Sequence, residues 1–162
     1  MKKVGVIMGS DSDLKTVQKA TDVLKELNIP FEVHVYSAHR TPEQARDFSF
    51  KARENGFGVI IAAAGMAAHL AGALAANTTL PVIGIPCSGA NLDGMDALLS
   101  TVQMPSGIPV ATVAVDGGKN AALLAAEILA VSDAELAKVL DERRRTEAYA
   151  VLEKDAGIMD RI

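Results

Sequence analysis

The chain has 162 residues, of which 49% are hydrophobic and only 4% aromatic, and its formal net charge is −4. This length fits a single domain over residues 1–162 with one core, and the small aliphatic residues suit the packing of helices on a sheet. The weak negative charge disfavours a nucleic-acid partner, because binding to a phosphate backbone needs a concentrated basic face.

Apolar runs and helical patterns alternate along the chain. The runs have the length and composition of strands buried on both faces, and we expect five strands at 4–8, 31–36, 59–63, 81–85 and 110–115. Apolar spacing and helix-end signals predict helices at about 14–28, 42–55, 66–76, 93–101, 120–130 and 133–152. Thr41 is expected to cap the helix that begins at Pro42, and Pro86 is expected to end the fourth strand.

This alternation indicates βαβ units around a parallel sheet. The chain is too short for an eight-stranded barrel, which typically takes about 250 residues. We therefore predict an α/β fold, a three-layer αβα sandwich of the flavodoxin-like or Rossmann kind with a five-stranded parallel sheet, followed by a C-terminal helix. Ligands of such folds bind beyond the carboxyl ends of the strands, so the loops after the first four strands are where a site is expected.

The loop after the first strand, 9–13 (GSDSD), has the properties of a phosphate site. Gly9 lets the backbone approach a ligand, Ser10 and Ser12 offer hydroxyls, and the following helix presents free N–H groups. Asp13 is a candidate acceptor for ribose hydroxyls. The loop matches neither the Walker A nor the G-x-G-x-x-G pattern, and simple N-capping of the helix is the alternative role.

His39 follows the second strand in the segment 37–40 (SAHR). A histidine at the carboxyl end of a strand can act as a general acid or base, because imidazole titrates near neutrality. Arg40 beside it can hold a phosphate or a carboxylate. A His-Arg pair in a loop is often only surface decoration, but the position at the predicted ligand rim favours a catalytic role.

The loop after the third strand, 64–70 (AGMAAHL), consists almost wholly of small residues, which let a flat ligand lie against the backbone. His69 in this loop belongs either to the site or to a core or subunit interface. His34 lies in the middle of a strand and is not expected to be catalytic. The histidines lack the spacing of metal ligands and there is no cysteine cluster, so we expect no metal site.

Cys87 is the single cysteine of the chain. It excludes an intrachain disulfide and favours a reducing compartment, and we interpret it as a small buried residue at a strand end. No signal-peptide pattern follows Met1, and the apolar stretch 59–76 is interrupted by glycines and a histidine, unlike a membrane span. The residues alone therefore predict a cytoplasmic acid–base enzyme that acts on a phosphorylated small molecule.

Four segments in order resemble the 5-(carboxyamino)imidazole ribonucleotide mutases, also known as the class I catalytic subunit of phosphoribosylaminoimidazole carboxylase. The segments are 9–13 (GSDSD), 37–42 (SAHRTP), 67–70 (AAHL) and 102–110 (VQMPSGIPV). The helical segment 120–126 (NAALLAA) is also similar to this family. The resemblance extends over about residues 4–152, almost the whole chain.

The resemblance implies a step of de novo purine biosynthesis. The carboxylate of 5-(carboxyamino)imidazole ribonucleotide moves from the exocyclic nitrogen to ring carbon 4, giving 4-carboxy-5-aminoimidazole ribonucleotide, without a metal or cofactor. Decarboxylation to aminoimidazole ribonucleotide and trapped carbon dioxide is implied, with His39 as acid toward the departing nitrogen and base toward the proton on carbon 4. The resemblance also implies a homo-octamer.

The binding residues follow from the same resemblance. It places the phosphate at Ser10 and Arg40 with Ser12 near it, the ribose at Asp13, and the carboxylate at Ser37 and Ala38. It packs the imidazole against Gly65, Met66, Ala67 and Ala68, with His69 and Leu70 beside the ring.

A second branch of the family uses carbon dioxide and aminoimidazole ribonucleotide directly. That branch carries SAHK in place of the SAHR at 37–40 and lacks the AAHL segment, so both features favour the mutase. The mutases usually have GGAAHLPGM in the third loop, whereas here Met66 replaces a Gly, and Ala71 and Ala73 replace the Pro and the Met. These changes affect the fine shape of the ring pocket.

Two alternatives to the mutase remain. One is the carboxylase that depends on carbon dioxide. The other is a flavodoxin-like module that binds a phosphate or FMN without turnover, and it is disfavoured because aromatic residues that could sandwich a flavin are scarce. Fold alone does not decide between them.

Overall fold

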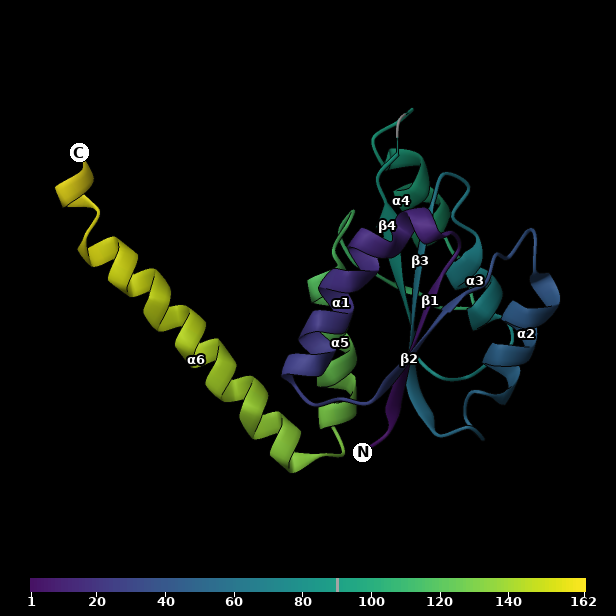
Figure 1. Ribbon diagram of the computed structural model, residues 1–162, viewed down its shortest axis with the longest axis horizontal. Helices are drawn as coiled ribbons and strands as arrows, with labels where there is room; N and C mark the ends of the chain where they lie inside the picture. Colours follow the sequence, from purple (N-terminus) through teal and green to yellow (C-terminus); the bar gives the residue numbers. More distant parts are fainter. Residues whose placement is uncertain (90) are drawn as a thin grey trace.

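A five-stranded parallel sheet with helices on both faces forms the body of the molecule (Figure 1), in a computed structural model that describes residues 1–89 and 91–162. The strands lie in the order β2-β1-β3-β4-β5, and every neighbouring pair is parallel. This is the strand order of the flavodoxin-like fold, which confirms the predicted fold class. The strands are β1 (Lys3–Met8), β2 (Phe31–Val35), β3 (Phe57–Gly65), β4 (Val82–Cys87) and β5 (Ala111–Thr112).

The helices cover the sheet in two layers, α1 and α5 on one face and α2 and α3 on the other (Figure 1). Alternation along the strands explains this division, because successive side chains point to opposite faces. On β1, Val6 packs toward α1 and α5 whereas Ile7 packs toward α2 and α3, and both are fully buried. The helices are α1 (Leu14–Glu26), α2 (Pro42–Lys51), α3 (Leu70–Ala75), α4 (Met95–Val102), α5 (Gly118–Ala130) and α6 (Ala134–Ala156), with two 3-10 turns, η1 (Asp11–Asp13) and η2 (Met159–Arg161).

Pro86 lies inside β4 and does not end it, so that prediction was wrong. The carbonyl oxygens of Gly84 and Pro86 accept hydrogen bonds from Val113 and Asp116, which places the nitrogen of Pro86 on the β5 side of the strand. Proline has no N–H to donate there. The ladder between β4 and β5 therefore cannot continue past Pro86, and β5 is only two residues long where six were predicted for 110–115.

The third helix begins later than predicted. Residues 66–69 form two tight turns, with the Ala68 amide donating to the Met66 carbonyl and the His69 amide to the Ala67 carbonyl at 2.9 and 2.8 Å. Helix α3 starts only at Leu70. The small-residue segment after β3 is therefore a loop at the carboxyl edge of the sheet, where ligands of this fold bind.

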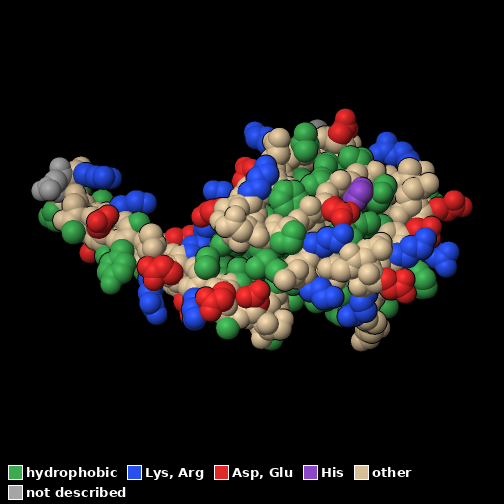
Figure 2. All heavy atoms as spheres, turned by 60° about the horizontal axis from the view of Figure 1, so that its bottom comes forward, with side chains coloured by type: hydrophobic (Ala, Val, Ile, Leu, Met, Phe, Trp, Pro, Cys, Tyr) green, Lys and Arg blue, Asp and Glu red, His purple; other side chains and the backbone are tan. Residues whose placement is uncertain are grey.

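Helix α6 leaves the body and projects into solvent as an arm (Figures 1 and 2). Asp133 begins it by accepting a hydrogen bond from the Leu136 amide at 3.1 Å, as expected of an N-cap. Within the helix only Leu136 and Leu140 are buried. Over the described residues, no helix combines the length and apolar character needed to cross a membrane.

Candidate active site

A cavity of about 430 Å³ lies at the carboxyl ends of β1, β2, β3 and β4. It brings together every site residue expected from the sequence except Ala68, which is buried and does not line the cavity. The expected residues around it are Gly9, Ser10, Ser12, Asp13, Ser37, Ala38, His39, Arg40, Gly65, Met66, Ala67, His69 and Leu70. Ala64, Ser88 and Gly89 also line it; they lie in loops where a site was expected but were not named as site residues.

The loop after β1 caps the 3-10 turn η1 and also presents the Asp13 carboxyl group at the cavity. Ser10 caps η1, because its hydroxyl oxygen accepts from the Ser12 amide at 3.3 Å. Asp13 stands at the N-cap of α1 but makes no capping hydrogen bond. Burial raises the pKa of Asp13 from its ordinary value, although the Cys87 thiol and the Ser10 backbone oppose the shift. Asp13 is thus a half-buried carboxyl group at the cavity, available to a ligand.

The loop after β2 is a closed turn that carries His39. The Thr41 hydroxyl accepts from the Ser37 amide at 2.8 Å and donates to the Ser37 carbonyl at 3.2 Å, while the Ser37 hydroxyl accepts from the Arg40 amide at 3.1 Å. Thr41 precedes α2 and Pro42 occupies its first turn, as predicted, but the Thr41 hydroxyl closes the turn and does not cap the helix. These bonds fix the backbone on both sides of His39.

His39 and His69 meet over the cavity. The His39 Nε2 and His69 Nδ1 atoms are 2.9 Å apart, and the two rings lie edge to face with centroids 5.0 Å apart. One nitrogen of this pair donates a hydrogen bond and the other accepts it, according to the tautomers of the two rings. His69 therefore belongs to the cavity and not to the core, and the contact orients the His39 ring.

Met66 lies on the rim of the cavity in a conformation that rarely suits its residue type. Its φ is 53°, in the left-handed region that glycine adopts without cost. The side chain is 64% exposed. The family that the sequence resembles was expected to have Gly at this position, and compared with Gly, Met66 adds both local strain and an apolar side chain at the rim.

The loop after β4 is anchored by Asp116, a residue that sequence reasoning missed. Its carboxylate accepts from the amide and the hydroxyl of Ser88 at 3.1 and 2.6 Å, and from the Thr16 hydroxyl at 3.3 Å. Partial burial alone would raise the pKa of Asp116, but the hydrogen bonds from Ser88 outweigh it and lower that pKa from its ordinary value. Asp116 is therefore a stable anion that contacts the wall of the cavity.

Cys87 is a buried residue at the end of β4, as predicted. Burial raises its pKa to about 12, and the nearby carboxylates of Asp13 and Asp116 add to this effect. The thiol is thus protonated at neutral pH and is unsuited to nucleophilic attack.

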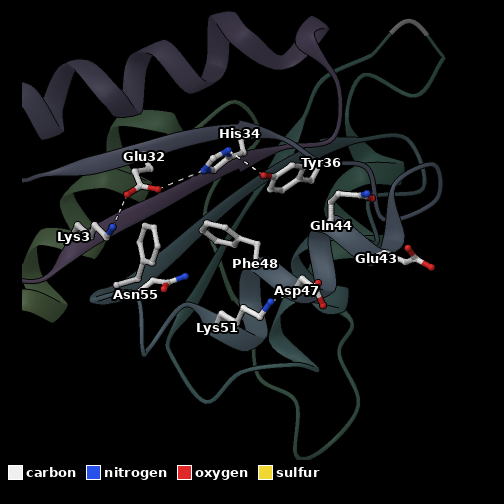
Figure 3. Close-up of a pocket in the computed structure, with 11 residues that line it drawn as sticks. Lys3, Glu32, His34, Tyr36, Glu43, Gln44, Asp47, Phe48, Lys51 and Asn55 are labelled. Atoms are coloured by element: carbon white, nitrogen blue, oxygen red, sulfur yellow. Dashed lines mark hydrogen bonds and ion pairs between the residues drawn. The ribbon is translucent and has the colours of Figure 1, made fainter.

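A second hollow lies between β2 and α2, away from these loops (Figure 3). Its polar groups are tied to one another: Lys3 pairs with Glu32, and His34 lies between Glu32 and the Tyr36 hydroxyl, at 3.6 and 3.2 Å. The His34 ring also stacks on Tyr36. His34 thus has a structural environment on the edge strand, as its place in the sequence suggested. In the part of the chain that the structure describes, no three potential ligands come together to hold a metal ion.

The sequence and structure are similar to one group of known proteins. Residues 3–149 match the family model described as AIR carboxylase. The N5-carboxyaminoimidazole ribonucleotide mutase of Bacillus subtilis is 56% identical over 152 residues, covering 93% of this chain and 94% of that protein. The Escherichia coli (strain K12) protein of the same name is 51% identical over 153 residues, covering 93% and 90%. The crystal structure of Treponema denticola PurE has a TM-score of 0.86 and 32% identity, covering 94% of this chain and 96% of that one.

Proposed function

The chain belongs to the AIR carboxylase family, and we propose that it is the mutase of de novo purine biosynthesis that converts 5-(carboxyamino)imidazole ribonucleotide to 4-carboxy-5-aminoimidazole ribonucleotide. Curated relatives at about half identity over nearly the whole chain carry the mutase name. The structural observation that carries the proposal is the His39–His69 pair over a cavity that also holds the 9–13 loop and Arg40.

The proposed reaction needs one proton delivered and one removed. Cleavage of the bond between nitrogen and the carboxylate carbon releases carbon dioxide, and the electron pair of that bond stays on nitrogen, which takes a proton from His39. Carbon 4 then attacks carbon dioxide, and neutral His39 removes the proton that carbon 4 carried. The histidine ends as it began, so one titratable group suffices, and His69 supports this cycle by holding the His39 ring.

A cavity lined largely by small residues favours recapture of carbon dioxide. The Gly65–Ala67 wall and Ala38 leave space for a flat ring against the backbone. Holding both reactants together makes the second step effectively intramolecular. In this arrangement Ser10 and Arg40 bind the phosphate with Ser12 near it, Asp13 binds the ribose, and Ser37 lies at the carboxylate.

Two parallel assays test the function. The chain is offered 5-(carboxyamino)imidazole ribonucleotide, and separately aminoimidazole ribonucleotide with a low concentration of bicarbonate, and carboxylated product is followed. We expect product from the first mixture. Product from the second mixture alone would instead support the carboxylase, and no product from either, with nucleotide or flavin bound, would support a binding module.

Arg40→Ala should weaken substrate binding more than turnover. The guanidinium is proposed to pair with the phosphate, which stays unchanged during the reaction. Loss of the guanidinium therefore weakens binding of the substrate and of the transition state equally. We expect KM to rise about tenfold or more with little change in kcat, since charged hydrogen bonds contribute about 1.5–3 kcal/mol. Steady-state kinetics at saturating and limiting substrate measure both constants. Arg53→Ala, an exposed arginine bonded to Thr79 and away from the cavity, is the matched control, and an unchanged KM in Arg40→Ala would refute the phosphate role.

We also propose that the protein assembles as a homo-octamer through helix α6. The arm is too long to be covered by its own body, and beyond Leu140 it carries exposed apolar side chains on and near its end, namely Tyr149, Val151, Leu152, Ile158 and Met159. Hydrophobic side chains interrupt the charged ones along this projection (Figure 2). Exposed apolar side chains on a projecting arm fit burial against another copy of the chain.

Leu152→Glu should reduce the assembly to smaller species. A charge placed in an apolar contact loses its hydration, whereas the body keeps its own core. Ala150→Glu introduces the same charge on the opposite side of the helix, since two residues turn an α-helix by about 200°, and should leave the mass unchanged. Light scattering after gel filtration gives the mass of each variant. If both variants still form octamers, helix α6 does not take part in the subunit interface.

We place the protein in the cytoplasm, in keeping with its single cysteine, which is reduced and buried. Fractionation of the source cells followed by immunodetection checks this location.

A further inference from the structure

Asp116 joins three segments beside the β4 edge of the cavity. Its carboxylate binds Ser88 after β4 and Thr16 on α1, and its own amide donates to the Pro86 carbonyl at 2.9 Å. Lys19 on α1 adds a contact to its carbonyl at 3.4 Å. Asp116 holds a φ of 56°, which residues other than glycine seldom adopt. Such a residue persists where its surroundings fix it and often marks a functional region.

The direction of the hydrogen bonds determines what Ser88 can offer a ligand. The carboxylate is ionised and can only accept, so the Ser88 hydroxyl donates its one hydrogen to Asp116 at 2.6 Å. Both lone pairs of the Ser88 oxygen remain available to accept. A hydroxyl bonded to a carboxylate is also a stronger acceptor, because successive hydrogen bonds polarise one another.

Ser88 lines the same cavity as Asp13, the proposed ribose acceptor. The two lie on neighbouring walls, since the Asp13 carboxyl is close enough to Cys87, the residue before Ser88, to influence its thiol. The cavity's positive group, Arg40, and the Ser10 hydroxyl are taken by the phosphate in the proposed arrangement. The side formed by Asp13 and Ser88 is therefore an acceptor surface, which is suited to the hydroxyl groups of a sugar and not to a phosphate.

We infer that Ser88 accepts a hydrogen bond from a ribose hydroxyl of the substrate, and that Asp116 is the positioning residue that orients and polarises Ser88 for this contact. The inference rests on the proposed function, because it assumes a ribonucleotide in the cavity. In this arrangement two carboxylates on different segments recognise the sugar. Asp13 contacts it directly, and Asp116 acts through Ser88.

Three variants separate this role from a purely structural one. Asp116→Gly removes the acceptors and leaves a residue that adopts the left-handed backbone readily. Asp116→Asn keeps one acceptor oxygen and also tolerates that backbone, but it cannot accept from both Ser88 donors as the carboxylate does. Ser88→Ala removes the hydroxyl and keeps the amide. The variants are compared on the ribonucleotide substrate and on its 2′-deoxy and 3′-deoxy analogues.

We expect Asp116→Gly to raise KM for the ribonucleotide about tenfold, the effect of losing one well-placed hydrogen bond to a polarised group, with kcat unchanged. Asp116→Asn should recover part of this loss. One of the two deoxy analogues should be insensitive to Asp116→Gly, because it lacks the hydroxyl that contacts Ser88. Ser88→Ala should add nothing in the Asp116→Gly background, since residues in one network are not additive.

Three results would overturn the inference: an unchanged KM in Asp116→Gly, equal losses on all three substrates, or additive effects of the two substitutions. A fall in melting temperature with unchanged KM would mark Asp116 as structural only. Assays of the wild-type chain test the proposed function separately, because that function fails if 5-(carboxyamino)imidazole ribonucleotide gives no carboxylated product. In that case the Kd of aminoimidazole ribonucleotide decides the inference, and an equal Kd in wild type and Asp116→Gly contradicts it.

Discussion

His39→Asn is expected to lower kcat by a factor of about a thousand or more, in the range that positioned acid–base groups contribute, while the Kd of the nucleotide stays close to that of the wild type. Asparagine keeps a polar side chain of similar reach but cannot exchange a proton near neutrality. Without that exchange, neither the departing nitrogen nor carbon 4 can complete its step. Single-turnover kinetics measure the chemical step, and calorimetry measures binding.

His34→Asn is the matched control for this substitution. His34 is also a histidine of the β2 region, but it lies at the second hollow between Glu32 and Tyr36 (Figure 3). Its substitution should leave kcat and Kd unchanged. Full activity in His39→Asn would refute the proton-transfer role, and a comparable loss in His34→Asn would point to an indirect effect through β2.

Gly118→Ala is expected to cost about 3 kcal/mol of unfolding free energy, at the upper end of what overpacking a tight contact usually costs. Gly118 is the first residue of α5 and packs directly against the backbone of α1. A β-carbon added there would lie 2.3 Å from the Thr16 carbonyl oxygen and 3.1 Å from the Lys19 β-carbon. The Thr16 carbonyl belongs to the backbone of α1 and cannot rotate away, so one helix must shift. Urea or thermal unfolding followed by circular dichroism measures the change.

Gly157→Ala provides the comparison for this prediction. A β-carbon at Gly157 would meet only the Glu153 carbonyl oxygen, at 3.8 Å, which is ordinary van der Waals contact. Its unfolding free energy should stay within about 0.5 kcal/mol of wild type, as for surface substitutions in general. Equal stability of Gly118→Ala and Gly157→Ala would mean that the α1–α5 contact is softer than the structure indicates.

The sheet was predictable because its strands are buried on both faces. Runs such as 59–63 are apolar at every position, and this pattern indicates strand in a βαβ sequence. The ends of elements were less predictable, because they depend on contacts outside the element. Pro86 continues β4 only because its nitrogen faces the side where β5 stops. The loop 66–69 contains no helix-breaking residue, yet the left-handed φ of Met66 delays the start of α3.

The residues around the cavity were predictable where they follow a strand directly, as 9–13, 37–40 and 65–70 do. Ser88 lies in the loop after the fourth strand, which was among the loops where a site was expected, but no motif there singled it out. The 2.9 Å contact between His39 and His69 was not predictable, because it depends on side-chain rotamers in two loops 30 residues apart. Asp116 belongs to no motif, and only the folded chain brings it to Ser88.

The strand order also has a consequence for how the chain is made. The first 65 residues contain β1, β2 and β3, so β1 has both of its neighbouring strands before the rest of the chain has left the ribosome. The face of this partial sheet that carries Val6 and Ile61 has α1 upon it but still lacks α5, which arrives only at 118–130. Until then that apolar surface is open to misassociation, as in other folding intermediates. We expect docking of α5 at Gly118 to be a late step in folding. The contact between α1 and α5 at Gly118 would then contribute to the stability of the folded protein and also end the period in which the nascent chain can misassociate.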